Sequence, residues 1–315
     1  MVLKVIYQTN SSKDMQELDI LILGGGWTAT FLIPLLRERH LTFAATTTDG
    51  RQVAGSPTLK WRFDPTASGK DQADAFSALP RARHVLITFP LKGNGQSALV
   101  VRTYGLTHGD EGGEEGGCRS RFLQLGSTGI WQSDPAQAPW MDRHSPYAEE
   151  DARATAEDEL LGLGGCVLNL AGLWGGPRDP RHWVDRVATT KEGVRGKGSL
   201  HMIHGVDVAR VIVAVMKGEW ETVGHGQRWM VTDGFVYDWW SLFAGWADIG
   251  QTNAGEEEGI MDAEPINQAR WVYELMNEEG VRALPRSMEA LGRCYDTREL
   301  WNTLGIAPLK GGLGM

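Results

Sequence analysis

The sequence contains little cysteine. Cys118, Cys166 and Cys294 are spread over 315 residues, and no two of them form a CxxC pair. An odd number of widely separated cysteines argues against a disulfide framework and against a thiolate metal site. We therefore expect a reduced, cytoplasmic protein that holds no metal ion.

Long apolar runs and an excess of positive charge are also lacking. No apolar stretch reaches the ~20 residues that cross a bilayer, and the apolar run at residues 2–7 is too short for a signal peptide. The formal net charge is −9, whereas nucleic-acid-binding proteins usually carry a basic surface. The sequence therefore predicts no membrane and no nucleic-acid partner, which leaves a small-molecule substrate.

Short apolar runs alternate with helical segments along much of the chain. The runs predict strands at residues 19–23, 41–47, 59–63, 84–89, 121–125, 166–170 and 227–231. Such alternation is typical of βαβ units, which build a parallel sheet with helices on both faces. The expected fold class is therefore α/β, with a Rossmann-like doubly wound parallel sheet and a smaller, mainly helical C-terminal substrate region.

A glycine turn follows the first expected strand. Residues 24–29 read Gly-Gly-Gly-Trp-Thr-Ala and match the pattern G-x-G-x-x-A from Gly24 and Gly26. Between a strand and a helix, such a turn places backbone N–H groups against a dinucleotide pyrophosphate. Trp27 and Thr28 open the helix, and the Thr28 hydroxyl can add to the phosphate site.

The end of the second strand bears on the choice of cofactor. An acidic side chain there binds the adenosine ribose of NAD, whereas basic or hydroxyl side chains accommodate the 2′-phosphate of NADP. Asp49 lies 23 residues after Gly26, but Thr48 and Arg51 flank it. The Asp49-Gly50 pair is equally typical of a turn. The pattern slightly favours NADP over NAD.

Two later strands end in further candidates, because the carboxyl ends of parallel strands line the ligand crevice of this fold. Phe89, Pro90 and Leu91 follow the fourth strand and are expected at the cofactor, with a simple proline stop as the alternative. Ser127 and Thr128 follow the fifth strand, where a hydroxyl group can polarise a substrate carbonyl. A turn that uses these residues only for its geometry is the alternative.

The sixth strand is followed by a glycine-rich segment. Its first residues, Ala171, Gly172 and Leu173, are expected at the cofactor, and Trp174 and Arg178 are expected at the substrate.

Two other residues are assigned to the substrate pocket. Trp131 lies shortly after the fifth strand, and the chain's 13 tryptophans are frequent beyond residue 130, where large aromatic side chains can line an apolar pocket. His204 is the second, although a structural position ahead of the Asp207 cap is the favoured alternative.

These segments resemble the atypical and extended short-chain dehydrogenase/reductase superfamily, in its NAD-dependent epimerase/dehydratase-like branch. The motifs lie in the family's order over about residues 19–232: the glycine turn, Leu-Gly-Ser-Thr-Gly-Ile-Trp at 125–131, Leu-Ala-Gly-Leu-Trp-Gly-Gly-Pro-Arg at 170–178 and Met-Ile-His-Gly-Val-Asp at 202–207. The resemblance implies a nicotinamide cofactor and is compatible with a homodimer. The tryptophan-rich tail at 236–305 resembles fungal members.

The resemblance also suggests how the chain is organised. Residues 1–17 are expected to form an N-terminal extension, and residues 18–235 the NAD(P)-binding domain, of which 177–204 contribute to the substrate region. Residues 236–315 are expected to complete the substrate pocket, with helices at 238–248, 265–279 and 287–304 in this part.

The family's catalytic pair is altered in this chain. In the family, a Tyr acts as the acid, and a Lys four residues later lowers the pKa of that Tyr. Here Tyr147 is followed four residues later by Asp151, which would raise the pKa of the phenol. The next cation, Arg153, is expected on a different face of the helix. His144 and Tyr147 remain candidate acids, with an exposed loop position and a packing role as the respective alternatives.

The sequence therefore predicts an NAD(P)-dependent oxidoreductase that acts on a small or medium, largely apolar organic molecule of fungal specialised metabolism. The expected reaction is carbonyl/alcohol or imine hydride transfer with a non-standard proton donor. A non-redox isomerase, dehydratase or cyclase on the same fold is one alternative. A non-catalytic NADP-sensing protein is the other.

Overall fold

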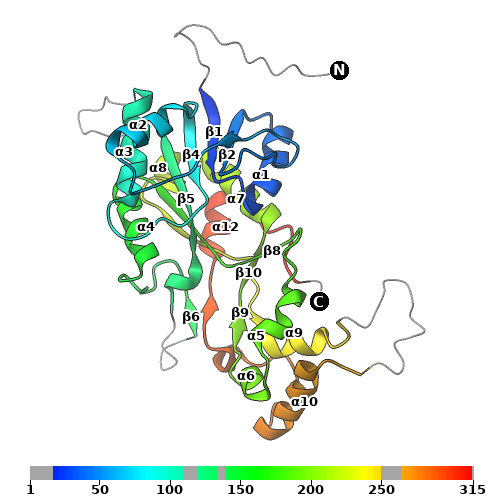
Figure 1. Ribbon diagram of the computed structural model, residues 1–315. Helices are drawn as coiled ribbons and strands as arrows, with labels where there is room; N and C mark the ends of the chain where they lie inside the picture. The colour runs from blue at the N-terminus through cyan, green and yellow to red at the C-terminus, as the bar shows by residue number, and fades with distance from the viewer. Residues whose placement is uncertain (1–16, 110–119, 133–138, 250–263, 314–315) are drawn as a thin grey trace.

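The computed structural model of the chain describes residues 17–109, 120–132, 139–249 and 264–313. Within these ranges, seven strands form one parallel sheet: β1 (Leu18–Leu23), β2 (Phe43–Thr47), β3 (Leu59–Lys60), β4 (Ala82–Ile87), β5 (Arg121–Ser127), β7 (Cys166–Leu170) and β11 (Arg228–Val231). The order across the sheet is β3-β2-β1-β4-β5-β7-β11. The chain therefore runs outward from β1 in one direction and from β4 in the other, which is a doubly wound sheet. The expected fold class is confirmed (Figure 1).

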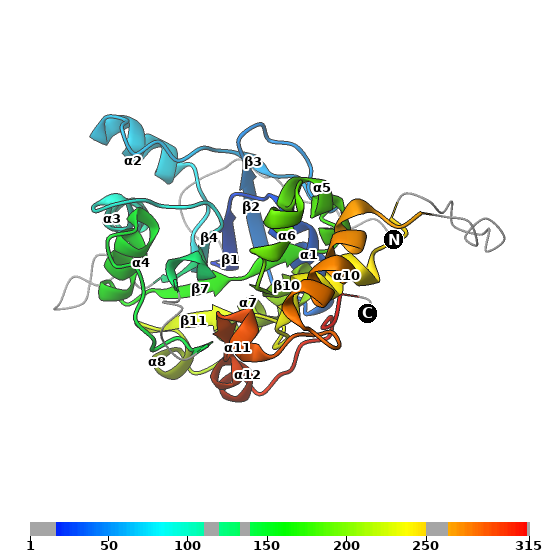
Figure 2. The same ribbon diagram turned by 90° about the horizontal axis from the view of Figure 1, so that it is seen from below.

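Helices cover both faces of this sheet. One face carries α1 (Trp27–Glu38), α7 (Gly205–Lys217), α8 (Trp220–Val223) and α12 (Arg298–Leu304). The other carries α2 (Gly69–Ser77), α3 (Gln96–His108) and α4 (Ala152–Gly162). Figure 2 shows the strands between these two groups of helices.

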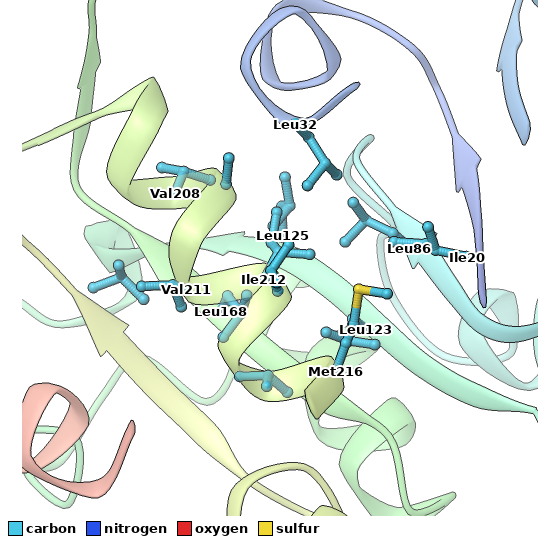
Figure 3. Packing of buried hydrophobic residues seen from close by; sticks show 14 of the residues in the cluster. Ile20, Leu32, Leu86, Leu123, Leu125, Leu168, Val208, Val211, Ile212 and Met216 are labelled. Atoms are coloured by element: carbon cyan, nitrogen blue, oxygen red, sulfur yellow. The ribbon is translucent and has the colours of Figure 1, made fainter. Parts of the chain in front are cut away.

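The alternation of side chains along β1 explains the two layers. Ile20 and Ile22 pack with α1 and α7, whereas Leu21 and Leu23 pack on the opposite face, and all four side chains are fully buried. A strand buried on both faces reads as a continuous apolar run, as the sequence does here. Figure 3 shows the first of these layers, in which α7 side chains meet the strands and α1.

A smaller, mainly helical lobe adjoins the carboxyl ends of the strands. It contains the 3-10 helix η2 (Pro180–Trp183) and the helices α5 (Val184–Val187), α6 (Lys191–Arg195), α9 (Trp239–Gly245) and α10 (Asn267–Glu279). Two short strand pairs connect it to the sheet: β8 (Gly172–Trp174) with β10 (Met202–His204), and β9 (Ser199–Leu200) with β12 (Tyr237–Asp238). Trp239, Trp240 and Phe243 fill its core. The lobe therefore combines residues 180–195 with α9 and α10 of the expected C-terminal region.

The prediction of one continuous helix over residues 287–304 is wrong. The segment forms α11 (Met288–Leu291), the strand β13 (Cys294–Tyr295) and α12. Gly292 has φ +79°, which ends the first helix, and β13 pairs with β6 (Trp140–Met141). Pairing with a strand more than a hundred residues away overrides the local helical preference. The interruption brings α12 back against the sheet.

Neither a membrane-spanning helix nor a metal-binding cluster is found in the described ranges. No helix there has the length and apolar character needed to cross a bilayer. Nor does that part of the chain gather three or more His, Cys, Asp or Glu side chains in a metal-binding arrangement. Cys166 and Cys294 are buried free thiols, and Cys118 lies outside the described residues.

The docking of α12 on the sheet can be tested at Trp301. Its side chain is 8% exposed, and its indole N–H donates to the backbone oxygen of Thr232 at 3.1 Å. We expect Trp301→Ala to lower the free energy of unfolding by about 3–5 kcal/mol, because it removes a buried aromatic ring. Urea unfolding measures this change. Trp301→Phe is the matched control and should cost clearly less, and equal losses in the two variants would contradict the packing argument.

Candidate active site

The glycine turn between β1 and α1 is fixed from two neighbouring strands. Gly24 has φ +94°, and a Cβ atom on it would lie 2.5 Å from Thr88 Oγ1. The Gly24 N–H donates to Thr46 Oγ1 at 3.0 Å, and the Thr88 hydroxyl donates to the Gly24 oxygen at 2.5 Å. Glycine is therefore required at this position for both its backbone conformation and its lack of a side chain.

The turn leaves the N-terminus of α1 accessible. Gly26 is exposed, and no atom of the described residues lies within 4 Å of the position that its Cβ would occupy. The first N–H groups of a helix have no acceptor within the helix, and the helix dipole is positive at this end. Trp27 and Thr28, which follow Gly26, begin the helix. The backbone here can therefore approach an anion closely.

A cavity of about 320 Å³ lies where this helix end meets the carboxyl ends of β4, β5 and β7. We call it the strand-end cavity. It is lined by Gly26, Trp27, Thr28, Thr88, Pro90, Leu125, Gly126, Arg153, Leu170, Leu173 and Arg178. The structure thus brings the glycine turn together with residues at the carboxyl ends of three other strands, β4, β5 and β7.

Two arginines supply positive charge to the strand-end cavity. Arg153 and Arg178 are both exposed, and within the described ranges no acidic side chain pairs with either guanidinium group. Arg178 instead lies over the Trp27 ring, with its Cζ 4.6 Å from the ring centroid. Both groups are free to bind an anionic ligand.

The position of Arg153 corrects a sequence-based expectation. Asp151 caps α4, which begins only at Ala152, so Tyr147 is not on the helix and the comparison of helical faces does not apply. Four residues before Arg153 stands Glu149 rather than a tyrosine. Sequence reasoning missed Arg153 as a site residue, and the Asp151 cap was the signal that could have found it.

The indole of Trp27 joins the glycine turn to the loop after β8. Its N–H donates to the Gly175 oxygen at 3.0 Å, and its ring packs edge-on against Phe31 at 4.9 Å. Because Arg178 stacks on the same ring, these contacts hold that loop over the end of α1. Trp27 therefore connects the sheet with the smaller lobe.

The residues expected to select the cofactor lie at the end of β2, outside the strand-end cavity. Thr48, Asp49 and Arg51 are exposed, and Arg51 forms an ion pair with Asp49 at 3.0 Å. Hydrogen bonds from the Arg51 backbone and side chain lower the pKa of Asp49. A guanidinium group and a carboxylate are thus available together at this strand end.

Several residues expected at the cofactor pack in the interior instead. Leu91 is fully buried, and Phe89 stacks on Phe63 at 5.7 Å, so only Pro90 of that segment lines the cavity. Ala171 is 7% exposed, and a Cβ on Gly172 would collide with the Met202 sulfur, because β8 and β10 are closely packed there. These residues thus have packing contacts in the structure, and their expected place at the cofactor stays a prediction. Leu173 lines the cavity.

Trp131 also packs in the interior, and its expected place at the substrate stays a prediction. Its side chain is fully buried, and its indole N–H donates to the Ser145 oxygen at 3.1 Å. Ser127 accepts a hydrogen bond from the Gly129 N–H at 3.1 Å, and Thr128 is 7% exposed. Ser127 is the last residue of β5 and caps the 3-10 helix η1 (Thr128–Ile130), which Thr128 begins. Both residues directly follow Gly126 in the chain. Their hydroxyl groups thus lie next to the cavity wall rather than among its lining residues.

The two expected acids do not lie at the strand-end cavity. Tyr147 donates its hydroxyl hydrogen to Asp158 at 2.8 Å, and burial together with this carboxylate raises the pKa of Tyr147. His144 is an exposed residue whose Nε2 lies 3.0 Å from Glu299 on α12. Both residues precede α4, and their contacts are with Asp158 on α4 and Glu299 on α12.

A second cavity of about 770 Å³ lies between β10, α9 and the end of the chain. Trp174, Arg178 and His204, which the sequence assigns to the substrate, are brought together here, with Trp246 and Leu313 from the smaller lobe. Arg178 lines both cavities. His204 also caps α7, since its Nδ1 accepts the Val206 N–H at 3.1 Å, and burial lowers its pKa.

Comparison with known proteins supports this description of the fold. No protein-family model matches the chain, and no curated protein matches its sequence. A functionally unknown conserved protein from Silicibacter pomeroyi has a similar solved structure, with a TM-score of 0.57 and 17% identity over 94% of this chain and 95% of that one.

Two further solved structures contain a nicotinamide cofactor. UDP-glucose 4-epimerase from Thermus thermophilus, solved with NAD, has a TM-score of 0.55 and 14% identity over 94% of this chain and 96% of its own. A human epimerase-family protein, solved with NADPH, has a TM-score of 0.51 and 14% identity over the same shares.

The chain shares its Rossmann-like fold with these proteins and with a short-chain dehydrogenase/reductase superfamily protein from Agrobacterium tumefaciens. A putative NAD-dependent epimerase/dehydratase from Methylobacillus flagellatus is also similar in structure, with a TM-score of 0.53 and 15% identity over 93% of this chain and 94% of its own. The link to fungal members stays a prediction.

The conformation of the glycine turn can be tested at Gly24. We expect Gly24→Ala to lower the free energy of unfolding by about 1–3 kcal/mol, because alanine is strained at this φ and its Cβ meets Thr88 Oγ1. Thermal unfolding measures the loss. Combining the change with Thr88→Ser leaves the clash in place, and combining it with Thr88→Ala removes the clash but not the strain. A Gly24→Ala protein as stable as the original chain would contradict this account of the turn.

Proposed function

We propose that the chain binds NADP or NAD in the strand-end cavity and uses it in an enzymatic reaction on a small organic molecule. The observation that carries this proposal is the N-terminus of α1, which opens beside Gly26 onto a cavity with two unpaired arginines. The similar structures solved with NAD or NADPH support the same class of cofactor.

The residues of the cavity fit a dinucleotide. The open space at Gly26 lets a pyrophosphate approach the backbone, and the helix end and the guanidinium groups of Arg153 and Arg178 match its negative charge. From there, the adenosine half extends over β2 and the nicotinamide half over β4, β5 and β7, because the strand order diverges at this point. When bound, the nicotinamide supplies hydride transfer.

We propose that NADP is slightly favoured over NAD. Arg51 and the Thr48 hydroxyl can bind a 2′-phosphate at the end of β2. Asp49 can bind a ribose hydroxyl in its absence. The Asp49–Arg51 ion pair is fully exposed, so either side chain can turn to the ligand at little cost.

The larger cavity is the proposed substrate site. Trp174, Trp246 and Leu313 offer apolar contacts, but much of the lining is charged or polar: Arg178, Asp179, Arg181, His182, His204 and Asp248. The cavity therefore suits a small or medium molecule that carries several polar groups beside an apolar part. Ser127 and Thr128 can orient a carbonyl at the edge of the strand-end cavity. Among the described residues that line this cavity, none is a tyrosine, so the proton donor in a carbonyl or imine reduction differs from that of the family.

The position of Tyr147 favours a second candidate function, a non-redox isomerase, dehydratase or cyclase. Its hydroxyl is committed to Asp158, so the acid that normally accompanies hydride transfer does not reach the cavity. Stoichiometric oxidation of NADPH during conversion of a substrate would exclude this second candidate, and conversion without nicotinamide turnover would establish it.

Titration with NADPH and NADH tests the cofactor proposal. We expect micromolar dissociation constants, measured from nicotinamide fluorescence. Gly26→Ala should fold normally but bind poorly, because its methyl group enters the space that the pyrophosphate needs. Arg153→Ala should weaken binding roughly tenfold or more, as expected for the loss of a charged hydrogen bond. Arg102→Ala, on the surface of α3, is the matched control. Absence of binding by the unchanged protein would overturn the proposal.

The basis of cofactor preference can be tested at the end of β2. We expect Arg51→Ala to weaken NADPH binding several-fold more than NADH binding, because it removes the partner of the 2′-phosphate. Asp49→Asn should do the reverse. The ratio of the two dissociation constants is the measurement, and a ratio unchanged in both variants would place the adenosine ribose elsewhere.

A further inference from the structure

A buried carboxylate lies directly behind the wall of the strand-end cavity. Glu157 is on α4 and is fully buried, whereas Gly126 on β5 lines the cavity. A Cβ atom on Gly126 would overlap Glu157 Oε1. Only a glycine residue therefore separates this carboxylate from the space that the nicotinamide half is proposed to occupy.

The carboxylate belongs to a small charged cluster. Glu157 Oε2 accepts the Asn169 amide at 2.8 Å and lies 3.3 Å from the Arg228 guanidinium. Arg228 also pairs with Asp158 at 3.0 Å, and Asp158 accepts the Tyr147 hydroxyl. One cation thus serves two carboxylates, so the cluster carries one net negative charge when Glu157 is ionised and none when Glu157 is protonated.

The side of Glu157 that faces Gly126 is not neutralised. Among the described residues, Oε1 of Glu157 has no hydrogen-bond partner, whereas both partners of the carboxylate are on Oε2. A buried charge acts over a longer distance than one in water, because the surrounding protein screens it weakly. The uncompensated charge is therefore felt in the cavity.

We propose that Glu157 biases the bound cofactor toward its oxidised form, because its carboxylate behind Gly126 stabilises the positively charged oxidised nicotinamide over the neutral reduced ring. This inference rests on the proposed binding of NAD(P) in the strand-end cavity. Glu157 does not touch the ligand, so it is a positioning residue that acts through its electric field. Arg153 lies at the same cavity, and its positive charge opposes this field at the oxidised ring.

The titration of Glu157 makes the bias depend on pH. Burial and Asp158 raise the pKa of Glu157, Asn169, Arg228 and Arg153 lower it, and the result is a pKa of about 7. The ionised form predominates above this pH. The oxidised cofactor should therefore bind more tightly as the pH rises through about 7, and its binding should release a proton near that pH. The reduced cofactor carries no ring charge, so Glu157 should add neither effect through the ring when this form binds.

The test is the ratio of the dissociation constants of NADPH and NADP⁺ between about pH 6 and pH 8. Nicotinamide fluorescence gives the first constant, and competition or calorimetry the second. We expect the ratio to rise several-fold, up to about tenfold, over this interval. Titration of groups common to both forms, the 2′-phosphate included, cancels in the ratio.

Two isosteric variants separate Glu157 from its neighbours. Glu157→Gln should give a ratio that no longer varies with pH and stays near the low-pH value of the unchanged protein. Asp158→Asn, the matched control, removes a charge from the same cluster and should keep the pH dependence. A flat ratio in the unchanged protein, or the same slope in Glu157→Gln, would overturn the inference.

A measurement on the unchanged protein covers the case in which Glu157→Gln does not fold. Calorimetry at about pH 7 in two buffers of different ionisation enthalpy should show more proton release with NADP⁺ than with NADPH. Equal proton release with both forms would overturn the inference. Absence of binding by either form would instead overturn the proposed function, so the two failures are distinguishable.

Discussion

The hydrogen bonds that hold the turn at Gly24 position the rest of the site. Thr46 at the end of β2 and Thr88 at the end of β4 bind the two backbone polar groups of this glycine. These strands lie on opposite sides of β1, so the turn is held from both sides at the point where the strand order diverges. The N-terminus of α1 is thereby aimed at the ends of β4, β5 and β7, where the strand-end cavity lies.

The two lobes meet at the same place. Trp27 leaves the glycine turn and reaches Gly175, and Arg178 from the same loop stacks on its ring. Because Arg178 lines both cavities, a ligand in the strand-end cavity and one in the larger cavity would share a wall. The geometry is suited to a reaction between two bound molecules.

The polar groups around α4 differ from the pattern of the family that the sequence resembles. Arg153 supplies a cation to the strand-end cavity, but the residue four positions before it is Glu149. Tyr147 does not line this cavity, and its hydroxyl is hydrogen-bonded to Asp158. Glu157, which lies four residues after Arg153 on α4, is buried against Asn169 and Arg228. The charged groups nearest the strand-end cavity are therefore two arginines that line it and a buried carboxylate behind Gly126.

The sequence by itself determined the α/β fold, the strands of the sheet and the glycine turn at Gly24, because alternating apolar runs and turn residues act over a few neighbouring positions. Tertiary structure decided the rest. Trp131 and Leu91 are buried by segments distant in the chain, and the segment 287–304 is broken by pairing with β6. Arg153 lies at the cavity and Tyr147 away from it because the cap at Asp151 sets where α4 begins and how it turns. Side-chain direction depends on such helix starts and on long-range contacts, which local sequence patterns do not specify.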